Sequence, residues 1–240
     1  MKIIILAGGL GTRISEETEN KPKPMVLIHG KPLLWHLMNI FAKQGYVDFI
    51  IAVGYKGEVI QKWVDSLKRN ILESKWNISV LETGKDTQTG GRIAICMKSI
   101  PNEKVIATYG DGLANISISS LVKFHDANNK IATVTAVRPP ARFGVLDIEN
   151  GAVKHFGEKN QSDAGWINGG FFVLEPEIVN YVNSNLEPFE TGALPKLVAE
   201  NQLLAYQHYG FWKPMDTLRE KQELEEFASR SNPPWLSDLT

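Results

Sequence analysis

The chain has 240 residues, of which 43% are hydrophobic and 22% charged, and its 26 basic side chains are balanced by 27 acidic ones. These values are typical of a globular protein and argue against disordered, fibrous and membrane classes. A formal net charge of -1 provides no field to neutralise the phosphates of a nucleic-acid backbone, so we expect no nucleic-acid partner. No repeat, linker or shift in composition divides the sequence, which predicts a single domain over residues 1–240.

Two features of the sequence indicate the cellular compartment of the protein. The apolar start ends at Gly8 and Gly9 without the small-residue pattern of a signal-peptide cleavage site. The one cysteine, Cys96, lies in an apolar run and predicts a buried thiol in a reducing compartment. We therefore expect a cytoplasmic protein with no membrane span.

In the first half of the chain, short apolar runs alternate with amphipathic segments. Residues 3–6 are apolar and mostly β-branched, as in a strand buried on both faces. A helix is expected to begin at Lys31 and Pro32 and to end at Gly45. The other expected elements are strands at 49–53, 78–81 and 105–108 and helices at 60–67 and 91–98. This alternation predicts β-α units that feed a parallel sheet.

The second half predicts a mixed sheet with an antiparallel portion. Asn150 and Gly151, between two apolar runs, indicate a hairpin with a type I′ turn. Strands are expected at 132–137, 145–148, 153–156, 166–174 and 203–206, and helices near 178–182, 192–200 and 217–227. Because prolines at 233 and 234 end any helix, the tail from about 231 to 240 is expected to be irregular.

A glycine-rich turn follows the first strand. Gly8, Gly9 and Gly11 let the backbone turn tightly and bring its N–H groups against an anion, which favours a phosphate-binding loop. A dinucleotide fingerprint would need a third glycine at position 14, where Ile14 stands, and this argues against a nicotinamide-dependent oxidoreductase. Taken alone, such a turn is as often structural as functional.

Cations follow this turn. Arg13 comes first, and Lys21 and Lys23 alternate with prolines that hold them in an extended segment. Ordered cations suit the binding of a triphosphate, whereas the alternative is a solvated basic loop. The combination of the turn and the cations favours phosphate binding.

These residues resemble the signature of the sugar-1-phosphate nucleotidylyltransferases, within which the chain is most similar to the bacterial cytidylyltransferases that act on glucose 1-phosphate. Besides residues 6–13 and 21–25, the similarity is carried by residues 15–18, 89–92, 108–112, 142–144, 167–172 and 210–217. The resemblance implies a three-layer α/β sandwich with a Rossmann-like, mostly parallel mixed sheet and a small antiparallel portion. It also implies that CTP and α-D-glucose 1-phosphate give CDP-glucose and pyrophosphate.

The resemblance further implies Mg²⁺ held by Asp111 and Asp216. Asp111 follows an apolar strand between two glycines, so little bulk surrounds its carboxylate, and Mg²⁺ takes one or two carboxylates together with phosphate oxygens. Each aspartate has an alternative interpretation. Asp111 suits a turn, and Asp216 before Thr217 suits the N-cap of a helix.

The other expected roles also come from the resemblance. Arg13 and Lys23 are the candidate catalytic cations, Arg13 for the leaving pyrophosphate and Lys23 for the α-phosphate or the incoming sugar phosphate. The nucleotide-binding set is Leu6, Ala7, Gly8, Gly9, Gly11, Thr12, Arg13, Lys23, Thr89, Gly90, Gly91 and Asp111. The sugar-phosphate set is Glu158, Lys159, Asn168 and Gly169.

Three alternatives stay open. Within the same chemistry, the acceptor could be another sugar or small phosphate, or the donor another nucleoside triphosphate. From another class, the chain could be a non-catalytic nucleotide-binding subunit, although Arg13, Lys23, Asp111 and Asp216 together argue against that. Gly90 and Gly91 could merely cap a helix. We also expect a homo-oligomer, as in related enzymes, and the short segment between residues 68 and 76 leaves its contacts open.

Overall fold

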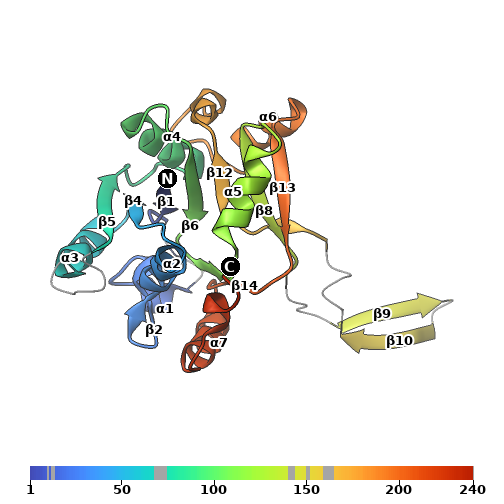
Figure 1. The fold of residues 1–240 in the computed structure, drawn as a ribbon. Helices are drawn as coiled ribbons and strands as arrows, with labels where there is room; N and C mark the ends of the chain where they lie inside the picture. Colours follow the sequence, from blue (N-terminus) through green and yellow to red (C-terminus); the bar gives the residue numbers. More distant parts are fainter. Residues whose placement is uncertain are drawn as a thin grey trace.

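The computed structural model describes residues 1–9, 11, 14–67, 75–139, 144–149, 152–158 and 165–239 (Figure 1). The strands are β1 (Lys2–Leu6), β2 (Leu27–Ile28), β3 (Lys31–Pro32), β4 (Asp48–Val53), β5 (Asn77–Glu82), β6 (Val105–Tyr109), β7 (Gly112–Ala114), β8 (Ala132–Val137), β9 (Gly144–Glu149), β10 (Ala152–Glu158), β11 (Ile167–Asn168), β12 (Phe172–Leu174), β13 (Leu203–His208) and β14 (Trp212–Pro214). The α-helices are α1 (Ser15–Thr18), α2 (Leu33–Ala42), α3 (Gly57–Leu67), α4 (Thr89–Ser99), α5 (Ile118–Asp126), α6 (Ala193–Ala199) and α7 (Leu218–Ala228). Three 3-10 helices are η2 (Lys23–Met25), η5 (Pro176–Tyr181) and η6 (Pro234–Leu236).

A central mixed sheet has the strand order β11-β8-β12-β6-β1-β4-β5, and β13 pairs with β8 as well. The pairs of β1 with β4 and β6, and of β4 with β5, are parallel, as the alternating pattern predicts. β12 runs antiparallel to both β6 and β8. The predicted mixed, mostly parallel sheet is therefore confirmed.

Helices cover both faces of this sheet and make three layers. Along β1, Ile3 and Ile5 pack into the cluster that contains the apolar side chains of α2, α3 and α5. Ile4 and Leu6 point to the opposite face, where they meet the side chains of α4 and α6. Both faces of β1 are thus buried, which explains why its sequence is a continuous apolar run. Cys96 of α4 lies fully buried in the second cluster, as expected.

Several elements differ from the sequence prediction. The helix expected from Lys31 begins at Leu33, because Pro32 is extended and pairs in a two-residue strand with β2. The expected strand at 166–174 is two strands, since Gly170 and Phe171 between them have positive φ angles of 77° and 47°. The segment near 178–182 is a 3-10 helix, and the tail contains a further 3-10 turn.

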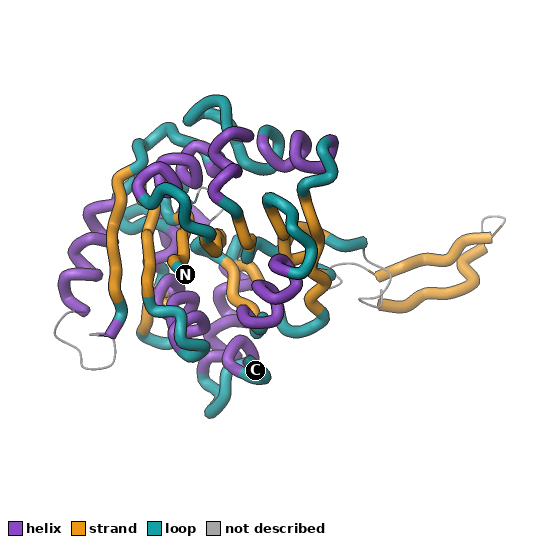
Figure 2. The backbone as a smooth tube through the Cα atoms, turned by 45° about the horizontal axis from the view of Figure 1, so that its top comes forward, coloured by secondary structure: helices purple, strands orange, loops and turns teal. Residues whose placement is uncertain are grey.

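The predicted hairpin is present as the antiparallel pair β9 and β10. It projects from the body of the molecule in both views (Figures 1 and 2). Asn150 and Gly151, on which the turn type was predicted, lie outside the described residues. Among the described residues, no helix combines the length and the apolar character needed to cross a membrane.

Candidate functional site

A cavity of about 230 Å³ opens at the carboxyl ends of the central strands. The chain passes from β1 to β4 and β5 on one side and then returns to β6 on the other side of β1. Ligands of open α/β sheets bind at such a switch of direction. The cavity is lined by Leu6, Ala7, Gly9, Gly11, Ile14, Lys23, Pro24, Thr89, Tyr109, Gly110 and Asp111. Most of the nucleotide-binding residues expected from the sequence are therefore brought together.

The glycine turn forms the floor of this cavity. A Cβ on Gly8 would lie 2.2 Å from the guanidinium carbon of Arg92, so any larger residue would displace that guanidinium. Gly11 has a φ of +66°, and the Thr18 hydroxyl donates a hydrogen bond to its carbonyl over 3.0 Å. The turn is thus held from both sides by α4 and α1. Leu10 and two predicted ligands, Thr12 and Arg13, lie outside the described residues.

Arg92 holds this floor rather than reaching the cavity. Its guanidinium donates hydrogen bonds to the carbonyls of Gly8, Val53 and Lys85 and to the Thr83 hydroxyl. These groups lie at or just after the carboxyl ends of β1, β4 and β5, so one buried cation connects the ends of three strands. Burial lowers the pKa of the guanidinium, which nevertheless stays charged at neutral pH. The sequence did not reveal this role, because no spacing rule connects Arg92 to those carbonyls.

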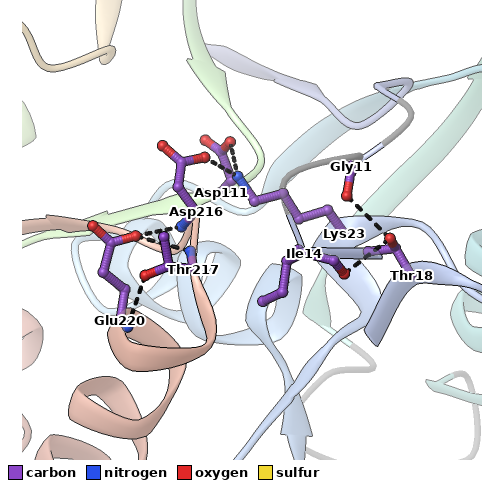
Figure 3. Close-up of polar contacts among 8 residues, drawn as sticks. All are labelled: Gly11, Ile14, Thr18, Lys23, Asp111, Asp216, Thr217 and Glu220. Carbon is purple, nitrogen blue, oxygen red and sulfur yellow. Dashed lines mark hydrogen bonds and ion pairs between the residues drawn. The ribbon is translucent and has the colours of Figure 1, made fainter. Parts of the chain in front are cut away.

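Lys23 and two aspartates meet at the edge of the cavity (Figure 3). The Lys23 ammonium lies 2.7 Å from Oδ2 of Asp111 and 2.6 Å from Oδ1 of Asp216. Lys23 begins η2, a 3-10 turn rather than the extended segment expected from the prolines. The two aspartates thus converge on one cation, although they lie 105 positions apart in the sequence.

The start of α7 places Asp216. Thr217, not Asp216, is the N-cap, and its hydroxyl accepts a hydrogen bond from the backbone N–H of Glu220. The Glu220 carboxylate accepts in return from the N–H groups of Asp216 and Thr217 over 2.7 and 3.0 Å. This capping box fixes the backbone while the Asp216 carboxylate points to Lys23 (Figure 3). The N-cap interpretation of Asp216 was therefore wrong, and Thr217-x-x-Glu220 was a signal that sequence reasoning missed.

The donor set fits a hard divalent cation. Two carboxylate oxygens already approach a single positive charge within 2.7 Å. Their side chains are 33% and 20% exposed, which leaves room for water and phosphate oxygens as further ligands. Mg²⁺ prefers such oxygens, so Asp111 and Asp216 could hold it.

Thr89 and Tyr109 on the cavity wall belong to a hydrogen-bonded network that also contains Asn168 and Glu190. Tyr109 and Thr89 donate to the two oxygens of the Glu190 carboxylate over 2.6 and 2.7 Å. The Asn168 amide donates to the Tyr109 hydroxyl over 2.9 Å. Burial and the neighbouring Glu190 carboxylate raise the pKa of Tyr109, which keeps its proton. Sequence reasoning missed Glu190, which lies in a loop without a recognisable motif.

The structure describes only some of the remaining predicted residues. Gly90 and Gly91 allow α4 to pack closely on the loop after η5, since a Cβ on either would lie 2.7 or 2.4 Å from a backbone carbonyl oxygen of residue 187 or 185. The Gly169 carbonyl accepts a hydrogen bond from the Trp212 indole over 2.9 Å. Glu158 ends β10, but its side chain and all of Lys159 lie outside the described part.

Together, a three-layer α/β fold with a glycine-lined cavity, a lysine and two convergent carboxylates defines a protein built to hold phosphate groups. A comparison with protein families identifies the class: residues 2–219 match the nucleotidyl transferase model. The chain therefore belongs to the nucleotidyl transferase family, and the predicted resemblance to sugar-1-phosphate nucleotidylyltransferases is confirmed.

Relatives named for their activities support this placement. The chain is 43% identical to a glucose-1-phosphate cytidylyltransferase of Salmonella typhi, over 98% of both chains. It is 30% identical to a mannose-1-phosphate guanyltransferase of Candida glabrata, over 99% of this chain and 68% of that protein. Among solved structures, HddC from Yersinia pseudotuberculosis superposes with a TM-score of 0.73 and 27% identity, covering 94% of this chain and 98% of HddC.

Proposed function

We propose that the protein transfers the cytidylyl group of CTP to α-D-glucose 1-phosphate and releases pyrophosphate. The observation that carries this proposal is the 43% identity, over 98% of both chains, with the Salmonella typhi glucose-1-phosphate cytidylyltransferase. The site supports it because a glycine turn, a buried lysine and Asp111 line one cavity, and Asp216 contacts the same lysine.

The reaction is an in-line displacement at the α-phosphorus of CTP. An oxygen of the sugar phosphate forms a bond to that phosphorus while the bond to the bridging oxygen of the β-phosphate breaks, and pyrophosphate leaves with the bonding electrons. The attacking oxygen is already ionised near pH 7, so no general base is required. What the chain must supply is alignment and positive charge for two polyanions that repel each other.

Different residues of the chain would align the two substrates and neutralise their charge. The backbone N–H groups of the glycine turn would bind the triphosphate, and Lys23 would neutralise the α-phosphate or the sugar phosphate. Arg13 would stabilise the leaving pyrophosphate. Asp111 and Asp216 would hold Mg²⁺, which when bound supplies charge that neutralises the phosphate oxygens.

Different residues would recognise the base and the sugar. Gly8, Thr89, Gly90 and Gly91 would face the base. The sugar phosphate would meet Lys159, and its hydroxyls would meet Glu158 and Asn168 beside Gly169. A carboxylate accepts from two hydroxyls, and an amide both donates and accepts.

The test is a panel of CTP, UTP, dTTP, GTP and ATP against the 1-phosphates of glucose, mannose and galactose, read by pyrophosphate release. We expect CTP with glucose 1-phosphate to have the highest kcat/KM. A preference for UTP or dTTP would contradict the base assignment, and GTP with mannose 1-phosphate would favour the activity named for the Candida glabrata relative. Nucleotide binding without release of pyrophosphate from any pair would favour the non-catalytic alternative.

Three further expectations stay predictions: one domain over residues 1–240, a homo-oligomer and a cytoplasmic location. Sedimentation of the purified protein tests the second, and cell fractionation tests the third. Limited proteolysis tests the first, since a single domain gives no pair of stable fragments.

A further inference from the structure

The network on the cavity wall has a fixed direction of proton donation. The backbone N–H of Gly170 donates to Oδ1 of Asn168 over 2.9 Å, which assigns the orientation of that amide. The amide nitrogen therefore faces Tyr109 and donates to its hydroxyl. Tyr109 in turn donates to Oε1 of Glu190, since a carboxylate only accepts.

The same argument assigns the direction of the hydrogen bonds that the Thr89 hydroxyl makes. Its oxygen accepts a hydrogen bond from the backbone N–H of Phe189 over 2.8 Å. Its one proton is donated to Oε2 of Glu190 over 2.7 Å. A hydroxyl has one proton and two acceptor sites, so the Thr89 hydroxyl has one acceptor site left, and Thr89 is among the residues that line the cavity.

We propose that Glu190 is a specificity-determining positioning residue, which holds the Thr89 hydroxyl as an acceptor for the exocyclic amino group of cytosine. Uracil carries an oxo group at the same ring position, and two acceptors facing each other repel. The inference rests on the proposed use of CTP and adds the residue pair that selects the base. Glu190 acts through Thr89 and does not itself contact the nucleotide.

Glutamine at position 190 would reverse the direction of this hydrogen bond. Because Asn168 still donates to Tyr109, the Tyr109 proton must still go to the oxygen of the new amide. The amide nitrogen would then face Thr89 and donate a hydrogen bond to its hydroxyl oxygen. The hydroxyl proton of Thr89 would point toward the cavity instead. A donor there fits the oxo group of uracil and not the amino group of cytosine.

The experiment measures kcat/KM for CTP and for UTP, the KM for glucose 1-phosphate, and the Kd of each nucleotide by calorimetry, in wild type and variants. We expect Glu190→Gln to lower the CTP-to-UTP ratio at least about tenfold, the effect of one mismatched hydrogen bond. Thr89→Val, which lacks the hydroxyl, should lower the ratio as well, and Thr89→Ser should keep it. Because the Thr89 pair tests the same hydroxyl, the inference stays testable if Glu190→Gln folds poorly.

Glu200→Gln is the matched control, since Glu200 at the end of α6 also accepts from a tyrosine, Tyr181, over 2.6 Å, and neither residue lines the cavity. It should leave the ratio unchanged.

A wild-type preference for CTP that Glu190→Gln and Thr89→Val leave intact would overturn the inference while the proposed function stands. A higher KM for glucose 1-phosphate with an unchanged ratio would instead assign Glu190 to the sugar and also overturn it. A wild type that binds both nucleotides equally would contradict the inference and the proposed function together, whereas preferential binding of CTP without turnover would contradict the function alone.

Discussion

Replacing Lys23 by methionine removes a charge that joins the two aspartates of the site. The ammonium lies 2.7 Å from Asp111 and 2.6 Å from Asp216, and its side chain is only 10% exposed. A hydrogen bond between charged groups contributes about 1.5–3 kcal/mol when buried, and exposed ion pairs contribute about 0–1 kcal/mol. Since the aspartates are partly exposed, we expect the free energy of unfolding to fall by about 2 kcal/mol in the absence of metal.

Turnover should fall much further than stability. A positioned donor that meets charge in the transition state is worth about 100-fold to 1,000-fold in kcat. We expect Lys23→Met to lose activity within this range while the protein remains folded at 25 °C. Urea unfolding measures the first effect, and pyrophosphate release from CTP and glucose 1-phosphate measures the second.

Lys104→Met is the control, because Lys104 also bridges two carboxylates, Asp126 and Glu175, away from the cavity. It should lose stability without losing turnover. Mg²⁺ should raise the melting temperature of Lys23→Met more than that of wild type, since the ammonium no longer competes for the aspartates. Near-normal kcat in Lys23→Met, or an equal Mg²⁺ effect in both proteins, would refute the reasoning.

Three further predictions follow from particular contacts. Asp111→Asn should lower kcat by about 100-fold or more while the circular dichroism spectrum is unchanged, and a normal rate across a Mg²⁺ titration would remove this carboxylate from the mechanism. Gly8→Ala should raise the KM for CTP and lower the melting temperature, because its Cβ would lie 2.2 Å from the Arg92 guanidinium; unchanged values would show that the floor can shift. Burial raises the pKa of the Cys96 thiol from 9.0 to about 12. The folded state then holds a proton that the unfolded state releases, so the free energy of unfolding should fall between pH 9.0 and about 12, and Cys96→Ala should lose this slope.

The sheet and most of its helices could be predicted because burial leaves a local pattern. β1 is apolar throughout since both of its faces are covered, and the spacing of apolar residues in α3 follows one buried side. α5 went unpredicted although Ser117 caps it, because its buried side includes His125 and only a few aliphatic residues. The strand expected at 166–174 failed because periodicity does not reveal the left-handed backbone at Gly170.

The site was predictable only where the chemistry lies in one motif. The glycine turn follows β1 directly, Lys23 comes after the short helix α1, and Asp111 follows β6. Asp216 was assigned by resemblance, and the capping box that orients it was not recognised. Glu190 and Arg92 act through contacts between residues far apart in sequence, such as the bond from Tyr109 to Glu190. Such long-range partners leave no spacing that a single sequence could reveal.

The most direct test of the phosphate site is a crystal structure of the protein soaked with CTP and Mn²⁺, with the ion located by its anomalous scattering. We expect the triphosphate to lie against the glycine turn at Gly8, Gly9 and Gly11 beside Lys23, with the ion bound by Asp111 and Asp216. Phosphates bound away from this turn, or an ion that contacts neither aspartate, would contradict the proposed site.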